Sequence, residues 1–182
     1  MGMAGPFRTR PAAIFCAKLA TLVACVTMLP GMQNRLGGSE LRLLEVHNVE
    51  RRTEALPPLK WDTELEANAR HYAEHLARSG EFKHSPNILG QDLEGENLWR
   101  GTAGAFGPER MVGLWIAEKQ HFVRGRFPNT SVTGNVADVS HYTQIMWRKT
   151  NKVGCAIARG KGKEVLVCRY SRPGNILGRS VF

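Results

Sequence analysis

The stretch Ser140-His-Tyr-Thr-Gln-Ile-Met-Trp147 begins the part of the chain that decides its fold. It is followed by Val153-Gly-Cys155, by Val167-Cys-Arg-Tyr170 and by the turn sequence Pro173-Gly-Asn175. A histidine, several aromatic residues, two cysteines and a tight turn thus fall within 36 residues. This density indicates a compact, oxidised domain outside the cytoplasm.

The two cysteines lie in a predicted β-hairpin with arms at residues 153–158 and 165–170. If Lys161-Gly162 is the two-residue turn, Cys155 faces Cys168 in a non-hydrogen-bonded pair. The α-carbons of such a pair are close enough for a disulfide. A pair of buried, reduced thiols is the alternative. The export signal described next favours the disulfide.

Residues 1–33 are basic at their start and contain the apolar run 19–29, which predicts an export signal or an N-terminal anchor. The run is shorter than the roughly 20 residues of a membrane span. Leu22-Val-Ala-Cys25 resembles a bacterial lipobox, but apolar residues continue beyond Cys25, so we favour cleavage near residues 30–35. The predicted location is extracellular or periplasmic, with anchoring of the N-terminus to the envelope membrane as the alternative.

The chain carries a formal net charge of +9. Loss of Arg8, Arg10 and Lys18 with the export signal leaves 22 basic against 16 acidic residues, or +6. This excess suits anionic envelope polymers or lipid headgroups. The basic residues are dispersed along the sequence, so no nucleic-acid partner is expected.

Three helices are predicted before the hairpin. The first covers residues 40–54, the second begins at the N-cap Asp62 and ends at Gly80, and the third begins at Pro108. Their buried faces are predicted to contain Leu41, Leu44 and His47 or Asn48, then Leu65, Ala69, Tyr72, Ala73 and Leu76, then Met111, Leu114, Trp115 and Phe122. Residues 81–107 and 123–139 are predicted to be long connections, which in a compact domain are usually functional.

Helices followed by strands in a short chain predict an α/β fold in which helices cover a sheet. The segments 141–147 and 165–175 resemble the two C-terminal signatures of the CAP superfamily (SCP-like domains), which comprises cysteine-rich secretory proteins, antigen 5 and plant class 1 pathogenesis-related proteins. The resemblance covers residues 40–180. It implies one domain over residues 34–182, a three-layer α/β/α sandwich with a mainly antiparallel central sheet, and the same disulfide.

The cysteine-rich members of the family carry several more disulfides and sometimes a C-terminal extension, neither of which is expected here, so the chain resembles the stand-alone CAP domains of bacteria. The resemblance also assigns a cavity tetrad to four residues, namely His84, Glu96, Glu118 and His141. Two imidazoles and two carboxylates in one groove suit a divalent metal ion, most naturally zinc. Some of the acids would then support the ligands rather than bind the metal.

One local motif predicts different chemistry. His71-Tyr-Ala-Glu-His75 matches the H-x-x-E-H pattern of a class of zinc metalloproteases. The apolar face of the same predicted helix lies on the other side, so both histidines are expected to face solvent rather than a cleft. We therefore do not expect a protease.

The sequence favours an exported binding module whose groove holds a divalent metal and an unidentified lipid, peptide or cell-wall fragment. A hydrolase, using metal-bound water or Glu118, is one alternative. A purely structural or interaction protein, with the tetrad as an internal network, is another. An enzyme is not favoured, because Ser85 and Ser140 neighbour tetrad histidines only in sequence, and a Ser–His–Asp arrangement is defined in space.

Overall fold

The computed structural model describes residues 1–2, 38–86 and 93–182. The export signal or anchor predicted for residues 1–33 falls outside these ranges, as does the lipid attachment considered at Cys25, and both stay predictions. In the described ranges no helix combines the length and the apolar character needed to cross a membrane.

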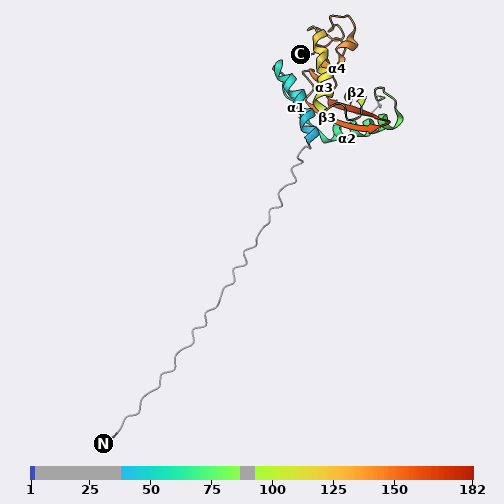
Figure 1. Ribbon diagram of the computed structural model, residues 1–182. Helices are drawn as coiled ribbons and strands as arrows, with labels where there is room; N and C mark the ends of the chain where they lie inside the picture. Colours follow the sequence, from blue (N-terminus) through green and yellow to red (C-terminus); the bar gives the residue numbers. More distant parts are fainter. Residues whose placement is uncertain (3–37, 87–92) are drawn as a thin grey trace. The chain divides into compact units, whose positions relative to one another are not determined.

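The described residues form an α/β fold of helices around a four-stranded sheet (Figure 1). In chain order the elements are α1 (Gly38–Thr53), β1 (Lys60–Trp61), α2 (Thr63–Ser79), β2 (Gly95–Thr102), α3 (Pro108–Ile116), η1 (Ala117–His121), η2 (Val136–Asp138), α4 (Ser140–Ile145), β3 (Lys152–Gly160) and β4 (Lys163–Ser171). The two η elements are short 3-10 helices.

The sheet has the strand order β1-β3-β4-β2, in which only the β1–β3 pair is parallel. Side chains alternate between its two faces. Val165 and Val167 pack in one cluster with α2, and Leu166 and Cys168 pack in another with α1, α3 and α4. In Figure 1, α2 lies beneath the strands and α1 and α3 lie on the other side. The three-layer, mainly antiparallel fold is confirmed.

The predicted hairpin has the expected register. Cys155 pairs with Cys168, and a disulfide joins them with their α-carbons 4.1 Å apart. Lys161 and Gly162 both have positive φ angles, of 50° and 73°, and form the two-residue turn. Such a turn matches the twist of the two strands, which is why it fixes the register.

The second predicted helix, α2, is confirmed at both ends. The Asp62 side chain accepts hydrogen bonds from the backbone N–H groups of Glu64 and Leu65, at 3.0 and 3.1 Å. Gly80 ends the helix in the left-handed conformation, with φ 80°. Glycine adopts this conformation without steric cost, which explains the stop.

The buried faces predicted for the other two helices are partly wrong. In α1 the expected His47 and Asn48 are buried, but Leu41 is 53% exposed, and the helix also buries Leu43, Glu50 and Arg51. In α3, Leu114 is exposed and Val112 is buried. A pattern search that counts only apolar residues cannot detect a buried polar face whose groups are paired by distant parts of the chain.

The predicted connection at residues 81–107 contains a strand. Residues 95–102 form β2, the edge strand that pairs with β4 from Gly95–Tyr170 to Thr102–Lys163. Glycine, glutamate and asparagine are depleted in strands, so Gly95-Glu-Asn97 concealed β2 from local reasoning. The strand matters for function because it carries Glu96.

His47 of α1 is fully buried between two hydrogen-bond partners. Its Nδ1 lies 2.7 Å from the carbonyl oxygen of Leu43, and its Nε2 lies 2.8 Å from the Tyr170 hydroxyl. The carbonyl can only accept, so Nδ1 carries the proton and Nε2 accepts from Tyr170. Burial lowers the pKa of His47 to about 4. The hydrogen bond to Leu43 opposes this shift by raising the pKa, and the positive charge of Arg51 lowers the pKa further.

We expect this histidine to make the protein less stable in mild acid. Its folded pKa lies below the unfolded value, so between about pH 6.5 and pH 4 the unfolded chain binds the proton first, and stability falls as the pH falls. The expected loss from pH 7 to pH 5 is about 2 kcal/mol from this group. Urea unfolding of the wild type and of His47→Gln measures it. A pH slope equally steep in the variant would contradict the assignment.

Candidate functional site

The first histidine–glutamate pair joins the segment after α2 to the start of β2. His84 Nδ1 lies 2.6 Å from Glu96 Oε1, which also accepts the backbone N–H of Ser85 at 3.0 Å. The Glu96 side chain is 7% exposed and that of His84 is 64% exposed. The carboxylate is therefore fixed within the fold, and the imidazole is presented to solvent.

Arg169 of β4 supports this pair from the neighbouring strand, because Glu96 and Arg169 are register partners. Its Nη2 lies 2.9 Å from Glu96 Oε2, and the two groups form an ion pair. The geometry of this contact is not that of a hydrogen bond, so Oε2 is buried without a hydrogen-bond partner among the described residues. Burial raises the pKa of Glu96, but the His84 hydrogen bond, the Arg169 charge and the Ser85 N–H outweigh it and hold the pKa below its usual value.

The second pair joins η1 to the start of α4. His141 Nδ1 lies 2.5 Å from Glu118 Oε1. Glu118 Oε2 accepts the backbone N–H groups of His141 and Tyr142, at 3.0 and 3.1 Å. The carboxylate thus binds the N-terminus of α4 as well as the imidazole, and Trp115 stacks on the His141 ring with their centroids 5.8 Å apart. Glu118 and Trp115 together fix the orientation of this ring.

Asn97 connects the two pairs. It follows Glu96 in β2, and because neighbouring residues of a strand point to opposite faces, its side chain lies on the other side of the sheet. Its Nδ2 donates to the His141 carbonyl oxygen at 3.1 Å and to the Tyr170 hydroxyl at 3.3 Å. The edge strand β2 therefore carries Glu96 of the first pair and Asn97, which contacts His141 of the second pair.

Both histidines use the same ring nitrogen in the same way. An ionised carboxylate only accepts hydrogen bonds, so each Nδ1 carries a proton, and in the neutral form of each imidazole Nε2 has the free lone pair. This is the arrangement of histidines that bind a metal through Nε2 while a carboxylate orients the ring. Each imidazole, that of His84 and that of His141, thus has the donor chemistry of a metal ligand that binds through Nε2, with its glutamate outside the coordination sphere.

The four predicted residues are brought together as two pairs rather than as one compact tetrad. Within residues 38–86 and 93–182 no group of three or more His, Cys, Asp and Glu side chains is arranged to hold a metal ion. The tetrad as a four-ligand site stays a prediction. The sequence did not indicate that Arg169, Asn97 and Trp115 contact the candidate site. Arg169 lies within the motif Val167-Cys-Arg-Tyr170, and Asn97 and Trp115 lie close in sequence to Glu96 and Glu118.

The H-x-x-E-H motif lies on the solvent-exposed side of α2, as predicted. The His75 ring stacks on Tyr72 with their centroids 5.8 Å apart, and His75 Nε2 lies 3.7 Å from Glu81 Oε2. These contacts place His75 on the surface of the helix.

Known proteins resemble this chain over most of its length. The model of the family described as "CAP: Cysteine-rich secretory protein family" matches residues 44–170. Pathogenesis-related protein 1C of Nicotiana tabacum is 35% identical over 145 residues, covering 79% of this chain and 81% of the relative. A PR-1 type pathogenesis-related protein of Sambucus nigra is 30% identical over 167 residues, covering 91% of this chain and 95% of the relative.

Among solved structures, that of NaASP2 with Zn2+ superposes with a TM-score of 0.69 at 23% identity. The match covers 82% of this chain and 88% of that protein. At this level of identity the likeness establishes the shared fold alone.

Proposed function

Because the chain belongs to the cysteine-rich secretory protein (CAP) family, we propose that it is an exported binding module of that family which holds a divalent metal ion, most naturally zinc. The observation that carries the proposal is the matched pair of histidines, each fixed through Nδ1 by a glutamate. The neutral imidazole is a good zinc ligand, and orientation by a carboxylate raises its basicity.

The roles of the residues follow from their contacts. His84 and His141 would bind the metal through Nε2. Glu96 and Glu118 would orient the two rings, and Arg169 would keep Glu96 ionised. A bound zinc ion would supply a Lewis acid that attracts an oxygen or an anionic group of a ligand. One family structure was solved with zinc, which is consistent with this proposal.

Besides the metal ion, the module would bind a second ligand, which we propose only by class: a lipid, a peptide or a cell-wall fragment. Export to an extracellular or periplasmic location agrees with the predicted signal at residues 1–33 and with the name of the family. The relatives named above are plant proteins, so the bacterial stand-alone type stays a prediction.

Calorimetric titration of zinc into purified residues 34–182 at neutral pH tests the metal site. We expect micromolar binding that His84→Ala/His141→Ala reduces at least 100-fold. Glu118→Gln is expected to weaken binding about 10- to 100-fold, because it removes only a residue that orients a ligand.

The matched control is His71→Ala/His75→Ala, which removes the two histidines of α2 and should leave the titration unchanged. Each variant is melted without zinc to confirm that it folds, and zinc should raise the wild-type melting temperature. No zinc binding by the folded wild type would contradict the metal proposal. Loss of stability in the pair variants without any zinc effect would favour the purely structural alternative.

A further inference from the structure

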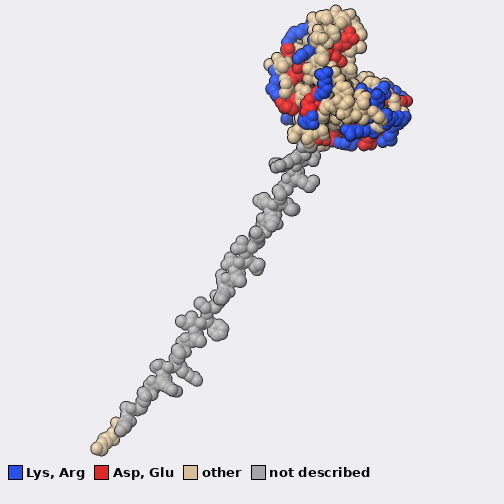
Figure 2. All heavy atoms as spheres, viewed as in Figure 1, with Lys and Arg blue, Asp and Glu red and all other residues tan. Residues whose placement is uncertain are grey.

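The last quarter of the chain has an excess of positive charge. Residues 139–182 contain nine lysines and arginines but only one acidic residue, Glu164. Elsewhere the two signs are mixed, and Figure 2 shows Lys and Arg interspersed with Asp and Glu over much of the visible surface. The fold determines where this excess positive charge lies on the surface.

Backbone hydrogen bonds bring four separate segments together beside β1 and the C-terminus. The N–H of Lys60 donates to Asn151 at 3.0 Å, that of Arg148 to Val181 at 2.9 Å, and that of Phe127 to Arg179 at 2.9 Å. Together these segments form what we call the basic end, whose exposed cationic residues are Lys60, Arg126, Arg148, Lys149, Arg172 and Arg179. The segments 57–61, 125–128, 146–151 and 172–182 contain no aspartate or glutamate.

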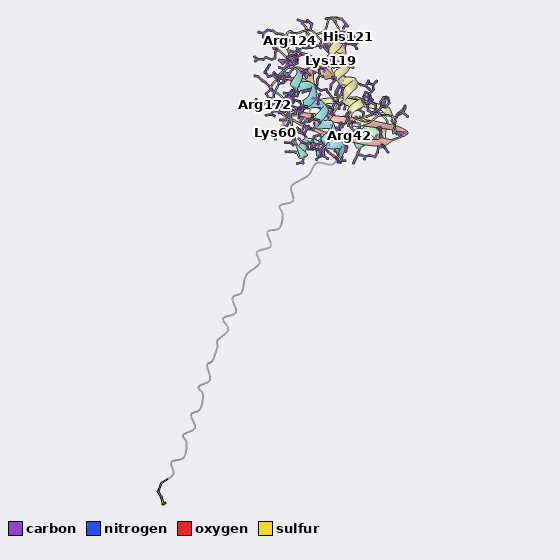
Figure 3. All side chains as sticks on the ribbon, turned by 60° about the vertical axis from the view of Figure 1, so that its left-hand side comes forward. Arg42, Lys60, Lys119, His121, Arg124 and Arg172 are labelled. Carbon is purple, nitrogen blue, oxygen red and sulfur yellow. A yellow bond between two sulfur atoms is a disulfide. The ribbon has the colours of Figure 1, made fainter. Side chains whose placement is uncertain are left out.

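The charges of the basic end are not neutralised by ion pairs. Within the described residues none of these six side chains takes part in a salt bridge. Figure 3 shows Lys60 and Arg172 on one side of the domain and Lys119 and Arg124 at another part. The latter two are paired with Glu50 and Glu54. The basic end is thus a site of uncompensated positive charge.

Two exposed aliphatic residues border this charge. Ile176 is 45% exposed and Leu177 is 73% exposed. Hydrogen bonds hold the loop that carries them, since the Asn175 side chain donates to Ser140 at 2.9 Å and the Gly174 N–H donates to the Gln144 side chain at 2.8 Å. Arg126 donates to the carbonyl oxygen of Gly178 at 2.9 Å, which ties a cation of the basic end to the same loop.

We propose that the basic end docks on the surface of a lipid bilayer that contains anionic lipids. Lysine and arginine are attracted to the negative potential of such a surface, and neighbouring aliphatic side chains can enter the boundary between headgroups and acyl chains. An anionic polysaccharide would attract the same charges but has no apolar layer for Ile176 and Leu177. This docking surface is separate from the proposed metal ligands and does not depend on them.

Sedimentation of the full chain with vesicles tests the proposal, using phosphatidylcholine alone and phosphatidylcholine mixed with phosphatidylglycerol. We expect binding to the mixed vesicles only. Arg148→Gln/Lys149→Gln should weaken it about 30-fold, from the usual contribution of two cations near an anionic surface. The matched control is Lys161→Gln/Lys163→Gln, which removes the same charge from the β3–β4 turn and should change binding less than about twofold.

A third variant, Ile176→Ser/Leu177→Ser, separates the lipid surface from a charged polymer. It should weaken vesicle binding and leave binding to dextran sulfate unchanged. All variants are first shown to melt at the wild-type temperature. The proposal is overturned if both charge variants lose binding equally, if the serine variant binds vesicles as the wild type does, or if the wild type binds dextran sulfate but no vesicles.

Discussion

Arg51→Ala is expected to lower the free energy of unfolding by roughly 4 kcal/mol or more. The Arg51 side chain is fully buried in α1 and donates to four backbone carbonyl oxygens. These belong to Pro57 at 2.9 Å, Ile145 at 2.7 Å, Trp147 at 3.0 Å and Thr150 at 3.2 Å. Alanine leaves buried acceptors without their donor, and each such loss typically costs about 1–3 kcal/mol.

Guanidinium chloride unfolding measures this loss, and the neighbouring residue supplies the control. Arg52 is exposed and, among the described residues, its side chain is paired only with Glu45, so Arg52→Ala should cost less than about 1 kcal/mol. Should Arg51→Ala fail to fold, Arg51→Lys remains informative, because an ammonium group has three donors and cannot reproduce the spread of the guanidinium contacts. If the Arg51 and Arg52 variants were equally stable, the buried network would have no such role.

Breaking the Cys155–Cys168 disulfide is expected to cost about 3 kcal/mol, because the bond closes a loop in the unfolded chain. The two residues are 13 positions apart and are almost completely buried. Dithiothreitol should therefore lower the melting temperature of the wild type. Cys155→Ala/Cys168→Ala should melt at a similarly lowered temperature with or without the reductant.

The double alanine variant is also the control for side effects of the reductant. A wild-type melting temperature equal to that of the double alanine variant, with and without dithiothreitol, would mean that the two cysteines form no stabilising disulfide. That result would favour the alternative left open by the sequence.

Local structure could be predicted wherever one short segment contains its own structural cause. The turn at Lys161-Gly162 sets the register of the hairpin, and therefore the partner of Cys155, through backbone geometry at two neighbouring residues. The N-cap Asp62 and the C-terminal Gly80 delimit α2 in the same local way. These features could be predicted because their physical causes lie within a few residues of their effects.

The members of the candidate site were predicted from the family resemblance, and their arrangement came only from the structure. Family resemblance pointed to His84, Glu96, Glu118 and His141, and spacing alone did not, because these residues are spread over 58 positions of the chain. The structure shows that they form two pairs, and that Asn97 and Arg169 connect and support them. Such contacts depend on strand register and on helix placement, which no local pattern contains.

The sequence by itself determined the family, the order of helices and hairpin, and the disulfide pairing. Only the tertiary structure decided that α1 buries Arg51, that β2 forms the edge strand carrying Glu96, and that six cations gather at the basic end. Each of these features depends on contacts between segments that are distant in the sequence. A polar group can be buried only where distant backbone or side-chain groups satisfy it, and those partners are assembled by the complete fold.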